Sequence, residues 1–273
     1  MEFSITSDLA GQTSDLDTFL RAAAGAGFQA VHWCHDWIRN PVFYDAAFAA
    51  DVKRRAADLG LRIADVHGAE GWGVTDERAD GELWLALNVN RVEFAGRVGA
   101  SALVVHLLPR PDDSSERFFQ RSVEKLQALR PACRAAGVRL AVENLPNPAQ
   151  SDEFLDAVLA AFAGDGVGLC YDSGHAVLSG QQHLLARHVD RLLVTHLHDN
   201  DGTADQHQLP GLGRADWPAI AATIAASDYH GTLNLELHLP EGETSEAFCR
   251  RAYATIRDLW EQGVVRRETG HRE

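Results

Sequence analysis

The sequence is poor in lysine and has no paired cysteines, and each absence disfavours a class of chemistry. Only two lysines, Lys53 and Lys125, occur in 273 residues, and both lie in segments with the pattern of amphipathic surface helices. A catalytic Schiff-base lysine or a pyridoxal phosphate enzyme is therefore disfavoured. The four cysteines form no CxxC pair, so we expect reduced, partly buried thiols.

Long hydrophobic runs and positive charge are also scarce. No apolar run approaches the roughly 20 residues that span a bilayer, and the first residues, MEFSITSDLA, lack the features of a signal peptide. We therefore expect a cytoplasmic protein with no membrane partner.

The 39 Asp and Glu outnumber the 25 Lys and Arg, giving a net charge of −14. This balance disfavours a nucleic-acid partner, although a local basic groove would be compatible with it.

Short β-rich runs alternate with helical patterns along the whole sequence. Runs such as ALVVHL and RLLVTHLH are apolar at nearly every position, which is typical of strands buried on both faces. No linker rich in Pro, Gly or Ser divides the chain. The predicted strands are Glu2–Thr6, Phe28–Trp33, Arg62–His67, Ala102–Leu107, Arg139–Glu143, Val167–Tyr171, Leu192–His198 and Thr232–Leu237, and the predicted helices are Asp15–Ala24, Ala46–Leu59, Leu83–Val98, Glu116–Ala136, Asp152–Ala163, His183–Val189, Trp217–Ser227 and Ser245–Gln262.

Eight strand–helix pairs in this order predict a single α/β domain, a (β/α)8 TIM barrel over residues 1–273. An open doubly wound sheet is disfavoured because the GxGxxA match at Gly25 to Ala30 follows a helix and precedes a strand. A dinucleotide-binding turn has the opposite order. A barrel of this size is compatible with a homo-oligomer.

Ionisable side chains collect at the C-terminal ends of the predicted strands, the face where barrels carry their active sites. Glu143 and Glu236 are embedded in apolar runs, and a buried charge is costly unless it is paired or binds a metal. Since no lysine lies nearby, a divalent cation is the simplest solution. Other candidate ligands follow the remaining strands: His67, His106, Asp172, His175, His196, His198, Asp205 and His207.

The donor set leaves the identity of the metal open. One histidine with three carboxylates suits Mn, Mg or Co, whereas four further histidines favour Zn and more than one ion. Trp33, Trp37 and Trp72 lie near the predicted loops after the second and third strands. Their faces could stack on the apolar C–H surface of a sugar, and simple packing of the loops explains them equally well.

Taken in order, the strand-end residues resemble those of the xylose isomerase-like barrel superfamily. The matching pieces are His106, Glu143, Asp172-x-x-His175, His196-x-x-Asp199, a PGxG loop and Glu236. That superfamily contains sugar (phosphate) isomerases and epimerases, inosose dehydratases and the endonuclease IV type of abasic-site nuclease. The resemblance covers nearly the whole chain. Its most specific parts are VGLCYDSGHAVLSG and THLHDNDGTADQHQLPGLGRADW.

The resemblance implies two overlapping ligand sets. In the epimerase members one divalent ion is held by residues matching Glu143, Asp172, His196 and Glu236. The two glutamates also act as acid and base on opposite faces of the substrate, and the residue matching His175 contacts sugar oxygens. The nuclease members add zinc ligands at positions that are also filled here, namely His67, His106, His175, Asp205 and His207.

Several features favour a sugar enzyme over a nuclease. The turn after the sixth strand reads DSGH, as in the sugar enzymes, rather than DTCH, and the net charge is acidic. One departure is that Asn200-Asp201-Gly202 stand where ketose 3-epimerases place a substrate-binding arginine. We therefore predict a metal-dependent isomerase or epimerase (Mn, Zn, Co or Mg) that converts a small-molecule sugar through an enediolate. The alternatives are a lyase or dehydratase on a keto-sugar or inosose, and an abasic-site phosphodiesterase.

Overall fold

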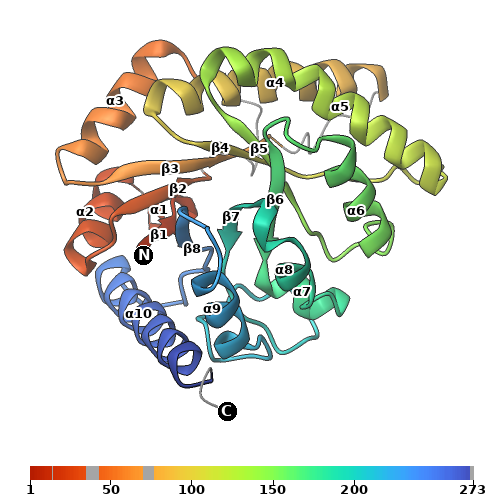
Figure 1. Ribbon diagram of the computed structural model, residues 1–273. Coiled ribbons are helices and arrows are strands. Elements are labelled where there is room, and N and C mark those ends of the chain that lie inside the picture. The colour runs from red at the N-terminus through yellow and green to blue at the C-terminus, as the bar shows by residue number, and fades with distance from the viewer. Residues whose placement is uncertain (14, 35–42, 70–76, 271–273) are drawn as a thin grey trace.

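The computed structural model describes residues 1–13, 15–34, 43–69 and 77–270. Eight parallel strands are hydrogen-bonded in the order β7-β6-β5-β4-β3-β2-β1-β8. A parallel bridge between Leu197 and Leu235 links the ends of β7 and β8, so the sheet forms a nearly closed (β/α)8 barrel surrounded by helices (Figure 1). This confirms the predicted fold class. The strands are β1 Glu2–Thr6, β2 Ala30–Trp33, β3 Arg62–His67, β4 Ala102–Val105, β5 Arg139–Glu143, β6 Val167–Asp172, β7 Leu192–His196 and β8 Thr232–Leu235.

Helices alternate with the strands and pack their apolar faces on the outside of the sheet. Side-chain caps fix several helix starts: Asp15 accepts a hydrogen bond from Thr18 N, and Ser114 accepts one from Arg117 N. The helices are α1 Asp8–Thr13, α2 Leu16–Ala26, α3 Ala46–Ala57, α4 Glu77–Val98, α5 Ser115–Ala136, α6 Asp152–Ala161, α7 Ser173–Ser179, α8 Leu184–His188, η1 Val189–Arg191, α9 Trp217–Ala225 and α10 Ser245–Gly270.

The main differences from the predicted elements lie near the strand ends. Helices α1 and α7 are not among the predicted elements, because each begins one or two residues after a strand and is short. Strands β4, β7 and β8 each end two residues before the predicted boundary, and the polar residues that follow enter the site. Helix α10 continues past the predicted end at Gln262 to Gly270, and Gly263 lets it approach Ala221 of α9 closely.

Two layers of side chains fill the molecule. The larger layer lies between strands and helices and includes Val31, Phe94 and Phe118, all fully buried. A small apolar cluster, formed by Ala102, Val104, Ala141, Cys170 and Val194, packs inside the barrel. Within the described ranges, no helix is long and apolar enough to cross a membrane.

Candidate metal centre and active site

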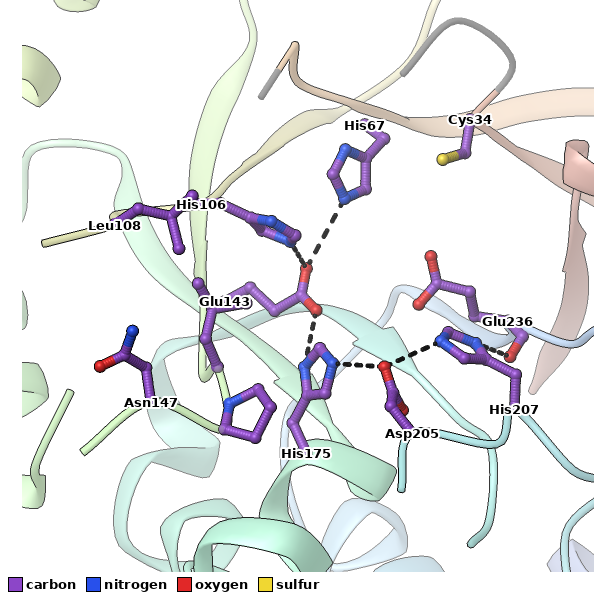
Figure 2. Close-up of a pocket in the computed structure, with 12 residues that line it drawn as sticks. Cys34, His67, His106, Leu108, Glu143, Asn147, His175, Asp205, His207 and Glu236 are labelled. Carbon is purple, nitrogen blue, oxygen red and sulfur yellow. Dashed lines mark hydrogen bonds and ion pairs between the residues drawn. The ribbon is translucent and has the colours of Figure 1, made fainter. Parts of the chain in front are cut away.

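A cavity of about 320 Å³ opens at the C-terminal ends of the strands. Its walls carry histidines and carboxylates on one side and apolar side chains on the other (Figure 2). None of its described lining residues is a lysine or an arginine. The lining residues are Cys34, His67, His106, Leu108, Glu143, Leu145, Pro146, Asn147, His175, Asp205, His207 and Glu236.

Glu143 is the central carboxylate of this cavity. It ends β5, and its side chain is 1% exposed. His106 Nε2 lies 2.9 Å from Oε2, and His175 Nδ1 lies 3.2 Å from Oε1. His67 Nε2, at the end of β3, is 3.8 Å from Oε2. One carboxylate therefore joins side chains from three neighbouring parts of the barrel mouth.

His196 and Glu236 complete the deep end of the site. His196 ends β7 and is fully buried, and Glu236 follows β8. The Nδ1 atom of His196 is 3.1 Å from Glu236 Oε2 and 3.3 Å from Glu143 Oε2. The two glutamates therefore approach the same imidazole nitrogen from different strands.

Asp172 holds the DSGH turn together. Its side chain caps α7 by accepting a hydrogen bond from His175 N at 2.7 Å, and His198 Nε2 lies 3.0 Å away. The ring of His198 occupies the space beside Gly174: a Cβ atom there would lie 2.0 Å from His198 Cε1. A residue with a side chain does not fit at Gly174 while His198 keeps this position.

A third group of side chains lies at the outer edge of the cavity. Asp205 Oδ2 is 3.2 Å from both His175 Nε2 and His207 Nε2. His207 also donates from Nδ1 to the Glu236 carbonyl oxygen at 2.9 Å. Its φ of 46° is the one positive value of a non-glycine residue in the described parts of the chain. Such strained conformations are typical of binding sites.

The loop that carries Asp205 and His207 is organised by Asp199. The buried Asp199 carboxylate accepts hydrogen bonds from Gly211 N, Ala215 N and Trp217 Nε1, at 2.8 to 3.0 Å. An antiparallel bridge between Asp199 and Gln208 closes the loop. The aspartate of the His196-x-x-Asp199 motif thus shapes the loop, and it is not among the residues that line the cavity.

The electrostatics of the site favour ionised carboxylates beside protonated imidazoles. Burial acts to raise the pKa of Glu143, but His196 and His106 outweigh it and hold that pKa well below its usual value. The pKa of Glu236 is lowered against burial in the same way, chiefly by His196. Burial lowers the pKa of His207, yet its hydrogen bond with Asp205 brings the net value up to about 9. The site therefore stabilises positive charge among its carboxylates.

The chemistry of the donor set fits a divalent metal ion. The Nε2 atom of His196 is buried and lacks a hydrogen-bond partner among the described residues, while its Nδ1 lies between the two glutamate carboxylates. A buried nitrogen without a hydrogen bond requires an explanation, and a bound cation supplies one. Groups of donor atoms that could hold an ion include the set His67, His106 and Glu143, and the set Asp172, His175 and His198.

The ionisable residues predicted for the site come together. The two glutamates, the two aspartates and the six histidines named from the sequence all lie at the barrel mouth, within a continuous network of contacts. Trp33 is not in the cavity: its side chain is 1% exposed and packs against Tyr44, Phe48 and Phe94 in the core. It is the last residue of β2, as in the predicted strand Phe28–Trp33, and its ring faces helices α3 and α4 rather than the barrel mouth. Trp37 and Trp72 lie outside the described residues.

The structure also adds residues that the sequence did not single out. Cys34, Leu108 and Asn147 line the cavity, and His32 and Asp65 form a buried pair beneath it. Asp65 is a charge inside the apolar run RIADVH, the same signal that identified Glu143 and Glu236.

Comparison with known proteins places this chain in a family. A family model described as "Xylose isomerase-like TIM barrel" matches residues 20–253. The chain belongs to this family. It is also 30% identical over 275 residues to the uncharacterized protein y4fM of Sinorhizobium fredii, covering 89% of this chain and 88% of that one.

Solved structures, two of them of epimerases, share the fold at low sequence identity. An L-ribulose 3-epimerase matches with a TM-score of 0.77 and 18% identity, covering 98% of both chains. The IOLI protein with a bound zinc atom matches at 0.76 and 18%, covering 97% of this chain and 98% of that one. The 3-keto-D-glucoside 4-epimerase YcjR from E. coli matches at 0.74 and 18%, covering 94% and 99%.

Proposed function

We propose that this protein is a divalent-metal-dependent sugar isomerase or epimerase. The observation that carries the proposal is the pair of buried carboxylates, Glu143 and Glu236, which meet at His196 in a cavity whose described lining has no Lys or Arg. Epimerases and a zinc-bound protein among the structural neighbours support it. The metal would be Mn, Zn, Co or Mg, and the substrate a small-molecule sugar.

The residues that would hold the ion are Glu143, Asp172, His196 and Glu236. When bound, such an ion supplies Lewis-acid stabilisation of the negative charge that develops on a carbonyl oxygen. Glu143 and Glu236 lie on separate strands, so each can face a different side of a bound sugar. One would remove the proton next to the carbonyl. The same residue returns it in an isomerisation, and the opposite residue supplies it in an epimerisation.

The remaining histidines would orient the substrate. His67 and His106 lie on one side of Glu143, and His175 lies on the other. Their ring nitrogens can donate hydrogen bonds to sugar hydroxyl groups once the substrate displaces the contacts to the carboxylate. Leu108, Leu145 and Pro146 supply the apolar wall against which a sugar ring's C–H groups can pack.

A solvent-exchange assay tests the proposal whichever product forms. The purified chain is loaded in turn with Mn²⁺, Co²⁺ or Zn²⁺ and incubated in D2O with a panel of ketoses and aldoses. Proton NMR then follows the C–H next to the carbonyl, and we expect that signal to disappear. Glu143→Gln and Glu236→Gln should each abolish the exchange while the fold persists; both are assayed at a saturating concentration of the ion, because each also loses a charged ligand.

The matched control for these variants is Glu93→Gln. This glutamate lies on α4 with its side chain 49% exposed, and its described ion pair is a local contact with Arg97. Exchange in Glu143→Gln at the rate of wild type and of Glu93→Gln would contradict the proposal. Formation of a new unsaturated or diketo product instead would assign the same site to the lyase or dehydratase alternative.

One observation favours a second candidate, metal-assisted cleavage of DNA at abasic sites. Asp205 stands between His175 and His207 at 3.2 Å from each, and this trio matches the additional zinc ligands that the resemblance implies for the nuclease members. Two or three ions would activate water and stabilise the leaving oxygen. The net charge of −14 opposes this candidate, because it repels a polyanion. Cleavage of an abasic-site duplex by the zinc-loaded chain tests it directly.

A further inference from the structure

A buried histidine–aspartate pair lies directly beneath the proposed metal centre. His32 of β2 is fully buried, and its Nδ1 contacts Asp65 Oδ1 of β3. A β-bulge between Val31 and His32 shifts the register of these two strands, so that His32 lies opposite Asp65. Bulges of this kind re-aim side chains next to active sites. The interior of a barrel is usually filled with branched apolar side chains, which makes this pair unusual.

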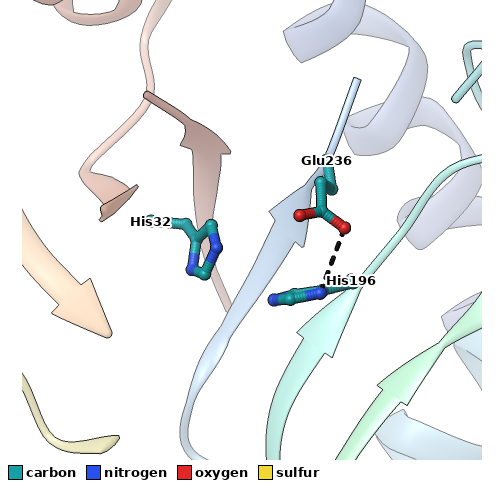
Figure 3. A group of neighbouring side chains, drawn as sticks. All are labelled: His32, His196 and Glu236. Carbon is teal, nitrogen blue, oxygen red and sulfur yellow. Dashed lines mark ion pairs between the residues drawn. The ribbon is translucent and has the colours of Figure 1, made fainter. Parts of the chain in front are cut away.

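The free nitrogen of His32 faces the metal-binding side chains. Its ring centroid is 4.6 Å from that of His196, and Figure 3 shows the two rings and the Glu236 carboxylate grouped together. One donor atom from each of these three residues lies within 4.8 Å of the other two. Because Asp65 engages Nδ1, Nε2 is the nitrogen left for another partner, and it has no hydrogen bond among the described residues.

The arrangement has the chemistry of a carboxylate–histidine–metal triad. Histidines that bind metals almost always use one ring nitrogen for the ion and donate the other N–H to a carboxylate or a carbonyl. The carboxylate fixes the tautomer and the ring orientation. His32 has its carboxylate in place, and its second nitrogen is buried and unpaired beside two residues of the proposed ligand set.

We propose that His32, oriented by Asp65, is a further ligand of the ion held by Glu143, Asp172, His196 and Glu236. The inference rests on the proposed function, since it concerns the same ion. A second imidazole makes the donor set richer in nitrogen, and nitrogen ligands favour Zn²⁺ or Co²⁺ over Mg²⁺ and Mn²⁺. The centre should therefore select zinc or cobalt more strongly than a site with one histidine and three carboxylates.

Metal affinity and coordination test this assignment without reference to catalysis. The chain and its variants are stripped of metal, and zinc affinity is measured by competition with a chromophoric chelator. Asp65→Asn should weaken zinc binding by about 10- to 100-fold, the usual effect of losing an outer partner. His32→Gln should weaken it at least as much, and should change the visible absorption of the Co²⁺-loaded protein. His183→Gln, on the exposed surface beside Asp152, is the matched control and should match wild type.

The possible outcomes separate this inference from the proposed function. If wild type binds no divalent ion, the proposed function fails. If wild type binds zinc, but folded His32→Gln has the same affinity and the same Co²⁺ spectrum, His32 is not a ligand and only this inference is overturned. Should the variants not fold, nitrogen-15 NMR of the zinc-loaded wild type decides. The His32 Nε2 resonance must then move to the position of a metal-bound nitrogen, and an unshifted resonance overturns the assignment.

Discussion

Replacement of Gly174 by alanine should destabilise the protein through one defined contact. A Cβ atom at this position would lie 2.0 Å from Cε1, 2.4 Å from Nδ1 and 2.7 Å from Nε2 of His198. The His198 ring cannot move aside easily, because it is fully buried, stacks on His207 with centroids 4.0 Å apart, and places Nε2 3.0 Å from Asp172. Overpacking costs about 1–3 kcal/mol, and a lost hydrogen bond to a charged group costs about 1.5–3 kcal/mol. Together, we expect a loss of roughly 2.5–6 kcal/mol in the free energy of unfolding.

Urea denaturation of the metal-free protein measures this loss. The control is Gly25→Ala in α2, where a Cβ atom would meet nothing within 4 Å. That variant should match wild type or gain up to about 1 kcal/mol, because alanine is the better helix former. In a His198→Ala background, Gly174→Ala should cost far less, since the clashing ring is gone. Equal costs in the two backgrounds, or a Gly174→Ala midpoint equal to that of wild type, would refute the reasoning.

Three further predictions concern charge, metal and packing. The pKa of His207 is raised to about 9. In the metal-free protein its stabilising contribution should therefore be fully present below about pH 6.5 and be lost as the pH rises through about 9. The urea midpoint, measured against pH, should fall over this range, and Asp205→Asn should make the fall smaller. If one ion is held, His175→Ala and His207→Ala should keep the metal content of wild type in elemental analysis; a loss of about one equivalent in either would show a multinuclear centre. Trp33→Ala should lower the free energy of unfolding by about 3–5 kcal/mol, in keeping with its place in the core, without changing the zinc affinity of the folded protein.

The barrel and most of the site can be predicted from the sequence because two patterns occur together: apolar runs of strand length, and charged residues embedded in those runs. Apolar runs of strand length between amphipathic helices leave few arrangements other than a parallel barrel. The carboxylates Glu143 and Glu236, embedded in such runs, mark the C-terminal ends of β5 and β8. Parallel topology brings strand ends together at one mouth, so residues far apart in the chain can be assigned to one site.

The features that the sequence did not reveal depend on side-chain direction. Trp33 follows His32 in β2, and neighbouring residues of a strand point to opposite faces. Either Trp33 or His32 therefore had to face the helices. The bulge between Val31 and His32 made it hard to predict which of the two side chains points into the barrel. The role of Asp199 in organising the loop after β7 could not be predicted either. Its hydrogen bonds come from atoms of that loop and of Trp217, and the spacing of residues in the sequence does not indicate where these atoms lie.

The distribution of unpaired nitrogens bears on how many ions the centre holds. At the outer edge, His175 donates to the Asn144 carbonyl and to Asp205, while His207 donates to the Glu236 carbonyl and to the same aspartate. Both rings use both nitrogens, so the outer trio is satisfied by protons alone, and an ion there would have to displace them. At the deep end, His196 Nε2 and His32 Nε2 are buried without a hydrogen bond among the described residues, and His196 Nδ1 contacts the two glutamate carboxylates. The need for a cation is therefore greatest between Glu143, His196 and Glu236, which supports a single ion at that position.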